Sequence, residues 1–498
     1  MVNISLEDLK KFIGRYSIGR DGYPYNTMGS LHFLRIKIPC GILNSNQFRE
    51  IASIASKYGR DLVEITDRQN IQLHWIKAED AIEIFSQLDK LGFTTDMCGQ
   101  GFKGAKYGDV RNIISCPASG LEKDEILECH PIVRKLTEFF TGNPSFLDLP
   151  RKFKIAATGC GSDCVRAAIN DLAFIAVKKG DQTGFTILVG GSIGASYPGP
   201  ILAKHAGIFI EPKDVFDVAV AAAEIHRDYS SRESKAKARF KYLIESWGLG
   251  KFIHFLEKKV GKNFDKYEGA IFTRRSLHEG VQTQKDPNLC YVNIPIIGGR
   301  ITSQVMINLA DLSEKFGTGE LRLTPTQNIL IPNVKKEEKD VLLKYLKELG
   351  FNFDVSFASW TSVGCSSDFC GKTLFKHAKD VVKDVVTSIE KTFSNEIIEN
   401  LKLEINASGC PNNCGGSLVS PIGLIGKQKK VENRIGQFYD VYVSDNSSIG
   451  FLIRKDVPSE EAADTVVSLI SEYVVNKKPE ETLLEFCKRK SNEPERKS

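Results

Sequence analysis

The sequence lacks the long apolar segments that a membrane-spanning or exported protein would carry. No stretch approaches the roughly 18 to 20 consecutive apolar residues that a transmembrane helix needs. Residues 6–11 are mostly charged, whereas a signal peptide has an apolar core near this position. We therefore expect a cytoplasmic protein that makes no contact with a membrane.

A strong excess of either charge is also missing. The net charge is +5 and the isoelectric point is about 8.4, which is too mild to indicate a dedicated nucleic-acid binder. A mildly basic surface could still attract a small acidic partner protein. The length of 498 residues, with 42% hydrophobic and 26% charged residues, indicates a globular chain of two to four domains and excludes a disordered or fibrous one.

Twelve cysteines in a long chain without export signals are better explained by metal, cluster or catalytic use than by disulfides. Half of them form close pairs, which are Cys160 with Cys164, Cys365 with Cys370, and Cys410 with Cys414. The others are scattered along the chain: Cys40, Cys98, Cys116, Cys129, Cys290 and Cys487.

The chain repeats itself, because residues 32–76 align without a gap onto residues 290–334 at an offset of 258 (327 − 69). Each copy reads as strand, helix and strand, with a helix expected around residues 48–55 and a stop at Gly59. In the first strand Arg35 and Lys37 share a face. The recurring residues include Ile36, Gly41, Ser45, Thr66, Gln69 and Asn70, which return as Ile294, Gly299, Ser303, Thr324, Gln327 and Asn328.

A second repeat follows each copy of the first. Residues 153–164 match residues 403–414 at an offset of 250 (403 − 153), and each is followed by a further strand. The chain therefore consists of two homologous halves, each with one small α+β unit and one larger unit. Helical material between about residues 215 and 266 links them.

Cys365, Cys370, Cys410 and Cys414 supply the four thiolates that a 4Fe-4S cluster needs. Glycines around them allow backbone N–H groups to approach the sulfurs. Two close cysteine pairs also make an all-thiolate zinc site, so spacing alone leaves both metals open.

The first half has no second close pair, because only Cys116 lies near the position equivalent to Cys365. Together with Cys160 and Cys164 it could hold a degraded cluster. The simpler interpretation is that these cysteines are left over from the duplication.

Basic residues form the second group of candidates. Lys152 and Lys154 are two apart in an expected strand beginning near residue 149, so they share a face. Two neighbouring ammonium groups repel each other, which lowers the pKa of one or both and is best tolerated with an anion between them. Arg35 and Arg111 lie in other segments, and each of these charges alone could be a solvated surface charge.

A series of sequence blocks resembles the sirohaem-containing sulfite and nitrite reductases over nearly the whole chain, from about residue 22 to residue 472. Such a series in order is specific, and it favours a cluster over zinc at the cysteine quartet. The blocks are TDRQNIQLHW (66–75), VRNIISCPASG (110–120), LPRKFK (149–154), NDLAFIA (170–176), GFTILVGG (184–191), GTGELRLTPTQNILIPNV (317–334) and SGCPNNCGG (408–416).

The resemblance implies an α+β, pseudo-twofold protein with ferredoxin-like half-domains at residues 20–85 and 286–345. It implies a first sirohaem- and substrate-binding domain at 86–225, a helical linker region at 226–285, and a second large domain with a 4Fe-4S cluster at 346–480. The metal ligands would be Cys365, Cys370, Cys410 and Cys414, with Cys414 shared between cluster and sirohaem. One departure is CSSDFC, in which four residues separate the first pair where the family usually has five.

Sirohaem is rich in carboxylates, so its site must offer cations and N–H donors. The resemblance points to Thr66, Arg68 and Gln72, which follow one another in steps of two and can face one way. Further candidates are Asn70, His74, Asn112 and Asn412. The four active-site cations of the family correspond to Arg35, Arg111, Lys152 and Lys154, with the arginines binding the anion and the lysines also relaying protons. The second half does not keep this set, since Arg35 becomes Asn293 and Lys154 becomes Glu404, which leaves one complete site per chain.

The leading hypothesis is a ferredoxin-dependent sulfite reductase that reduces sulfite to sulfide with six electrons. No flavin or nicotinamide fingerprint occurs, so the electrons must come from a ferredoxin or a similar small protein. Lys154 favours sulfite, because plant-type nitrite reductases tend to have asparagine there. The alternatives are a nitrite reductase, a cobalamin-pathway relative that binds a tetrapyrrole as substrate, and a cluster-bearing binding or sensor protein without turnover.

Overall fold

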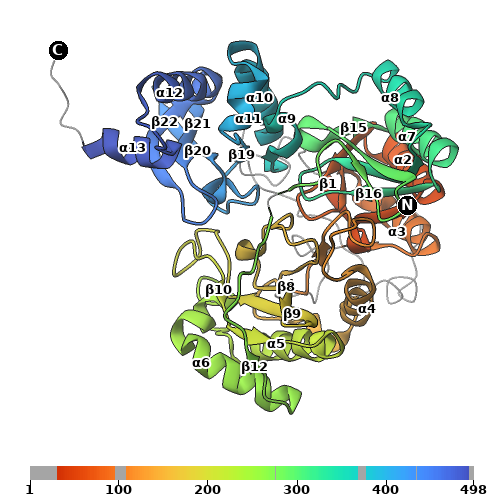
Figure 1. Ribbon diagram of the computed structural model, residues 1–498, viewed down its shortest axis with the longest axis vertical. Coiled ribbons are helices and arrows are strands. Elements are labelled where there is room, and N and C mark those ends of the chain that lie inside the picture. Colours follow the sequence, from red (N-terminus) through yellow and green to blue (C-terminus); the bar gives the residue numbers. More distant parts are fainter. Residues whose placement is uncertain (1–30, 96–107, 275, 368–376, 433, 493–498) are drawn as a thin grey trace.

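The computed structural model describes residues 31–95, 108–274, 276–367, 377–432 and 434–492. Within these ranges the chain forms four five-stranded sheets and one two-stranded sheet. Figure 1 shows the two half-domains at the right, the first larger domain at the bottom and the second at the upper left. The predicted α+β, internally duplicated architecture is confirmed. No helix among the described residues has both the length and the apolarity needed to cross a membrane.

The first half-domain is an antiparallel sheet with the strand order β15-β3-β4-β1-β5. α2 begins with a capping box between Asn44 and Gln47 and ends before Gly59, as the sequence predicted. Its elements from the N-terminal half are β1 (His32–Lys37), α2 (Ser45–Tyr58), β3 (Leu62–Ile65), β4 (Ile71–Ile76), α3 (Ala81–Lys90) and β5 (Thr94–Thr95).

The second half-domain has the strand order β13-β14-β17-β16-β2, and the two halves exchange edge strands. β15 pairs with β3, while β2 (Ile42–Asn44) pairs with β16. The remaining elements are β13 (Val281–Thr283), β14 (Leu289–Ile294), β15 (Arg300–Thr302), α7 (Ser303–Phe316), β16 (Glu320–Leu323), β17 (Ile329–Lys335) and α8 (Lys339–Glu348).

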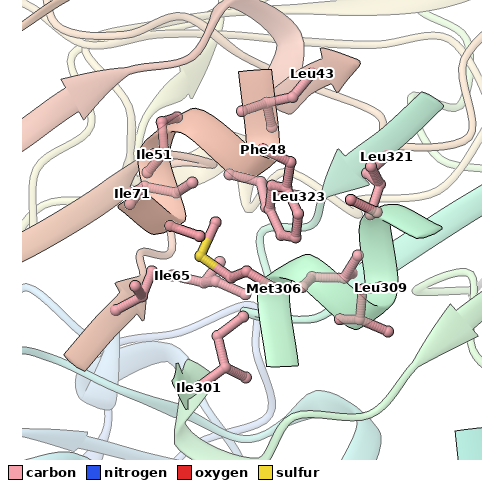
Figure 2. Packing of buried hydrophobic residues seen from close by; sticks show 14 of the residues in the cluster. Leu43, Phe48, Ile51, Ile65, Ile71, Ile301, Met306, Leu309, Leu321 and Leu323 are labelled. Carbon is pink, nitrogen blue, oxygen red and sulfur yellow. The ribbon is translucent and has the colours of Figure 1, made fainter. Parts of the chain in front are cut away.

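This exchange merges the two half-domains into one hydrophobic core. Figure 2 shows Phe48 and Ile51 of α2 packed beside Met306 and Leu309 of α7, with Leu323 between the helices. Separating the halves would expose this shared apolar surface to water, so the half-domains form one folding unit.

The first larger domain has the strand order β10-β9-β8-β7-β6, in which β6, β7 and β8 are parallel neighbours. The segment 226–285, expected as a helical linker, contains α6, and Phe240, Phe252 and Leu256 of that helix lie in the core of this domain. The elements are β6 (Ile114–Ser115), α4 (His130–Phe140), β7 (Ile155–Thr158), β8 (Leu172–Lys179), β9 (Gln182–Val189), β10 (Lys204–His205), β11 (Ile208–Phe209), α5 (Val215–Tyr229), α6 (Phe240–Val260) and β12 (Asp265–Lys266).

The second larger domain repeats this plan with the order β18-β19-β20-β21-β22 and parallel β18, β19 and β20. Its helices α10 and α12 contribute to a separate core. The elements are α9 (Phe357–Thr361), β18 (Val363–Gly364), α10 (Ala378–Thr392), α11 (Asn395–Asn400), β19 (Ile405–Ser408), β20 (Ile422–Val431), β21 (Arg434–Val443), β22 (Phe451–Pro458), α12 (Ala462–Asn476) and α13 (Leu483–Asn492).

Candidate active site

Three of the predicted cluster ligands lie at one edge of the second larger domain. Cys365 follows β18 directly, and the loop with Cys410 and Cys414 follows β19, its parallel neighbour. Parallel neighbours end at the same edge of a sheet, which brings the two loops together. The Gly409 N–H donates to the Cys365 sulfur over 3.2 Å. Cys370 lies outside the described residues.

Two buried residues that the sequence analysis did not assign to the site lie against the Cys365 segment. The Gln327 amide donates to the Gly364 carbonyl over 2.9 Å and accepts from the Gly364 N–H over 3.1 Å. A Cβ on Gly364 would lie 2.6 Å from the Cα of Lys379, and the Lys379 ammonium donates to the Ile65 carbonyl over 3.0 Å. The recurrence of Gln69 as Gln327 was the available sequence signal, whereas nothing indicated Lys379.

A cavity brings these cysteines together with the first half-domain. Arg35 of β1 and Thr66 of the turn after β3 line it, along with residues of the second half. Larger cavities elsewhere among the described residues have no cysteine in their lining. The other residues that line it are Asp67, Gln327, Gly364, Cys365, Ser366, Ser367, Cys410, Asn412 and Cys414.

The Arg35 guanidinium is oriented by Gln72, another predicted site residue. The two lie opposite each other on β1 and β4, and Nε and Nη2 of Arg35 donate to Gln72 Oε1 over 3.0 and 2.7 Å. The Gln72 amide nitrogen is buried and has no hydrogen-bond partner among the described residues, although Gln72 itself does not line the cavity. The second half keeps neither residue, because Asn293 and Leu330 take their places.

Thr66 and Asn70 close the turn that follows β3. The Thr66 hydroxyl accepts from the N–H groups of Arg68 and Asn70 over 3.3 and 3.1 Å. The Asn70 side chain accepts from the Ile38 N–H over 3.3 Å, which ties the turn to β1. Both side chains therefore shape the backbone beside the cavity.

Arg68 and Asn112 join this turn to the first larger domain. Arg68 donates to the Asn170 side-chain oxygen over 2.9 Å and to the Asn112 carbonyl over 2.6 Å. The Asn112 amide donates in turn to the Arg68 carbonyl over 3.0 Å. The steps of two from Thr66 to Gln72 thus do not place all these side chains on one face, because the turn interrupts the extended chain.

His74 does not line the cavity and lies in a buried ion-pair network. Its Nε2 is 3.0 Å from Glu64 Oε2, and neither side chain is exposed. Glu64 also accepts from Arg300 over 2.7 Å, and Arg300 reaches Asp380 over 2.9 Å. Burial alone would raise the pKa of Glu64, but His74, Lys379 and Arg300 hold that pKa well below its usual value. The network joins β4 and β3 to β15 and α10.

Lys152 and Lys154 flank the buried Phe153 just before β7. The regular strand begins at residue 155, later than expected, because Phe153 makes only an isolated bridge with Val110. Burial, followed by the positive charges of Lys152 and Arg68, lowers the pKa of Lys154 from 10.5 to about 7. The direction matches the predicted effect of paired ammonium groups, although burial contributes more than repulsion.

Arg111 is buried beside Asp109, with Nη1 of the arginine 3.1 Å from Oδ1 of the carboxylate. The Arg111 N–H donates to the Phe153 carbonyl over 2.9 Å, which fastens the arginine segment to the lysine segment. β1 reaches the same region through Lys37, whose ammonium donates to the Val110 carbonyl over 3.2 Å. The four predicted cations are therefore carried on segments that are hydrogen-bonded to one another.

The loop 409–416 is also held by the first larger domain. Arg166 donates to Glu404 over 2.6 Å and to the Gly415 carbonyl over 3.3 Å. Glu404 occupies the position that Lys154 has in the first half. The exchange of lysine for glutamate thus gives the second half a partner for an arginine of the first.

A second cysteine group is buried in the first larger domain. Cys116, Cys160 and Cys164 converge with His278, and the four ligand atoms all lie within 4.8 Å of one another. The preferred interpretation from the sequence, leftover cysteines, did not anticipate this convergence. His278 lies far downstream of the cysteines, so no motif spacing could have identified it.

Two family models match the chain. The nitrite and sulphite reductase 4Fe-4S domain matches residues 107–264, a range that contains Cys116, Cys160 and Cys164. The nitrite/sulfite reductase ferredoxin-like half domain matches residues 23–91 and 282–349. The two half-domain matches cover the repeat found in the sequence.

Similar proteins carry both reductase names. A ferredoxin–nitrite reductase from Leptolyngbya laminosa is 30% identical over 88% of this chain and 86% of its own length. A sulfite reductase [ferredoxin] from Mycobacterium tuberculosis H37Rv is 31% identical over 79% of this chain and 69% of its own. The solved structure of the Mycobacterium tuberculosis NirA protein has a TM-score of 0.84 at 27% identity, covering 98% of this chain and 91% of that one.

Proposed function

Because the chain belongs to the nitrite and sulfite reductase family, as its sequence blocks predicted, we propose that it is a ferredoxin-dependent sulfite reductase. The family uses sirohaem and a 4Fe-4S cluster, and the chain is an oxidoreductase of this family. The observation that carries the proposal is the cavity in which Arg35 and Thr66 of one half meet Cys365, Cys410 and Cys414 of the other.

The cluster would be held by Cys365, Cys370, Cys410 and Cys414, with Cys414 shared with the sirohaem iron. Of these four, Cys365, Cys410 and Cys414 lie among the described residues, on the loops after the parallel neighbours β18 and β19. The N–H contact to the Cys365 sulfur supports a thiolate at that position.

The residues around the cavity fit a cofactor rich in carboxylates. Arg35 lines the cavity and brings positive charge, and the Gln72 side chain that holds it has a buried amide N–H without a partner among the described residues. We propose that Thr66, Gln72 and Asn412 contact the sirohaem directly. We propose that the other predicted ligands hold the turn and the strands around the sirohaem; they are Arg68, Asn70, His74 and Asn112.

When bound, these groups would supply electrons one at a time to an anion held beside them. The protein's own residues bind that anion and provide protons. Arg35, whose Nε and Nη2 are held by Gln72, brings a guanidinium charge to the cavity, and Arg111 and Lys152 add positive charge. Lys154, with its pKa lowered to about 7, can both hold a proton and release it near neutral pH. It is therefore suited to donate protons as oxygen leaves as water.

Sulfite is the proposed substrate because lysine occupies both alternate positions of the PRKFK segment. Sulfite has three oxygens to remove and is partly a dianion near neutral pH, so a second ammonium group helps with charge and with protons. Nitrite is a monoanion with two oxygens. The second candidate is a nitrite reductase, which is favoured by relatives of that name at 30% identity.

The decisive experiment compares kcat/KM for sulfite and nitrite with a ferredoxin donor. We expect the larger value for sulfite, and we expect Lys154→Asn to shift the ratio towards nitrite. A wild-type preference for nitrite would support the second candidate instead. Absence of tetrapyrrole absorption bands from the purified protein would contradict both and leave a cluster-binding protein without turnover.

An acidic ferredoxin is the proposed electron donor, since the chain carries a net charge of +5. Reduction rates with ferredoxin should therefore fall as salt is raised, because salt screens attraction between the two surfaces. Rates with a small uncharged reductant serve as the control and should change little.

A further inference from the structure

Cys116, Cys160, Cys164 and His278 form a complete set of ligands at one buried point. Their residues come from three separate segments: the end of β6, the loop after β7, and the chain before β13. All four are buried, and among the described residues they form the one group of this kind whose ligand atoms converge.

The spacing of the ligand atoms is that of a single tetrahedral ion. A zinc ion with Zn–S bonds of about 2.3 Å places two of its sulfurs about 3.8 Å apart. The Cys160 and Cys164 sulfurs are 3.7 Å apart, and Nε2 of His278 lies 3.6 Å from the Cys160 sulfur and 3.2 Å from that of Cys116. These separations correspond to the edges of one small tetrahedron.

A 4Fe-4S cluster does not suit the same four groups. In a cubane each thiolate binds a different iron and points away from the cube, so its ligand sulfurs lie farther apart than those around one ion. A site with all ligand atoms within 4.8 Å leaves no room for four irons and four sulfides. Three thiolates and one imidazole are instead a common ligand set of structural zinc.

His278 is prepared for metal binding by its own neighbours. Its Nδ1 lies 2.7 Å from a Glu122 oxygen, which also accepts from the Tyr291 hydroxyl over 2.9 Å. Arg274 pairs with the other oxygen of Glu122. With its proton on Nδ1, the imidazole presents the lone pair of Nε2 to the sulfurs, the arrangement in which a carboxylate orients a zinc-binding histidine.

The duplication explains where this site came from. The Cys116 N–H donates to the Ala157 carbonyl over 3.2 Å, and the Cys365 N–H donates to the equivalent Ala407 carbonyl over 3.0 Å. Cys160 and Cys164 likewise correspond to Cys410 and Cys414. The same pair of loops thus carries thiolates in both halves, but the first half completes its set with a histidine from another segment.

We propose that Cys116, Cys160, Cys164 and His278 bind one zinc ion in a structural site separate from the redox cofactors. Four protein ligands close the coordination shell, so the ion would leave no position for a substrate. It would fasten the chain before β13 to the loop after β7. Arg166, two residues after Cys164, contacts the Gly415 carbonyl, so the zinc site would also support the loop 409–416.

The test is metal analysis and zinc K-edge X-ray absorption on the full-length protein purified without chelators. We expect about one zinc per chain, in addition to the iron of one cluster and one sirohaem. The absorption spectrum should fit sulfur neighbours at about 2.3 Å and one nitrogen at about 2.0 Å. Absence of zinc, a single iron in its place, or iron enough for a second cluster would overturn the proposal.

Substitutions of the proposed zinc ligands provide a second test. Cys160→Ser and His278→Ala should each lower the zinc content at least tenfold while the iron content stays near that of the unmutated protein. Cys129→Ser is the matched control, since Cys129 is buried in the same domain but is not in the ligand group. Retention of zinc in both ligand variants would contradict the assignment. If those variants fail to fold, the spectrum of the unmutated protein still decides the question.

Discussion

Lys154 allows the proposed anion site to be tested through pH alone. Its pKa is lowered to about 7, so near pH 6 most molecules carry the charge on this lysine. At pH 9, two units above that pKa, only about one molecule in a hundred does. Anion binding favours the charged form, so kcat/KM for an anionic substrate should fall as pH rises through 7. Nitrite is the better probe here, because it remains a monoanion over this range.

The magnitude follows from the strength of a hydrogen bond to a charged group, about 1.5 to 3 kcal/mol. Each 1.4 kcal/mol is about a tenfold change, so Lys154→Met should lower kcat/KM for nitrite about 10- to 100-fold at pH 6. At pH 9 the wild-type lysine is already neutral, and the two enzymes should differ by only a few fold. The ratio of wild type to variant is therefore expected to converge with rising pH.

The assay is nitrite consumption with a small reduced dye as donor, measured from pH 6 to pH 9. Other titrating groups affect both enzymes alike and cancel in the ratio. Lys178→Met, a change at an exposed position of β8, controls for loss of one surface charge and should give a ratio near one throughout. A ratio for Lys154→Met that stays constant across this range would refute the reasoning.

The same pKa shift has a consequence for folding. Because the folded pKa lies below the unfolded value of 10.5, unfolding takes up a proton between about pH 7 and pH 10.5. The contribution of this lysine to the free energy of unfolding should therefore become less favourable as pH falls through that window. Lys154→Met should gain stability relative to wild type on going from pH 10 to pH 7, measured by denaturant titration without substrate.

Four further substitutions test the supports of the site and its cysteines. Gln327→Leu leaves the buried Gly364 N–H and carbonyl without their partner. We therefore expect the free energy of unfolding to fall by roughly 2 to 4 kcal/mol, measured by denaturant titration. Iron analysis should also show a lower cluster content. Arg166→Ala removes the largely buried pair with Glu404 and should cost about 2 kcal/mol, with a lower melting temperature; an unchanged value would argue against a support for the loop 409–416. Cys414→Ser should abolish turnover and reduce bound iron, whereas Cys164→Ser should retain the iron of both cofactors; comparable iron loss in the two would place a cluster in the first half.

Local patterns in the sequence predicted a large part of the molecule. The gapless offset of 258 residues predicted the paired half-domains, and alternation and helical spacing predicted β1 and α2 with its end before Gly59. The ordered blocks predicted the family. Such features depend only on spacing along the chain, so they can be recognised without knowledge of the fold.

Which strands complete each sheet was decided only by the tertiary structure. The exchange of β2 and β15 between the halves has no signature in either strand, because each is three residues long and pairs with a segment more than 200 residues away. The shared core follows from that exchange, and the tertiary structure also decides that Arg35 meets the cysteine loops at one cavity.

The two cysteine groups also show which features the sequence predicts and which only the fold decides. Sequence spacing could count the thiolates of Cys365, Cys370, Cys410 and Cys414, since close pairs are a local feature. It could not connect His278 to Cys116, Cys160 and Cys164, because a histidine on another segment becomes a ligand only when folding brings it within bonding distance. The sequence determined which chemical groups are present, and the packing of distant segments decided which of them act together.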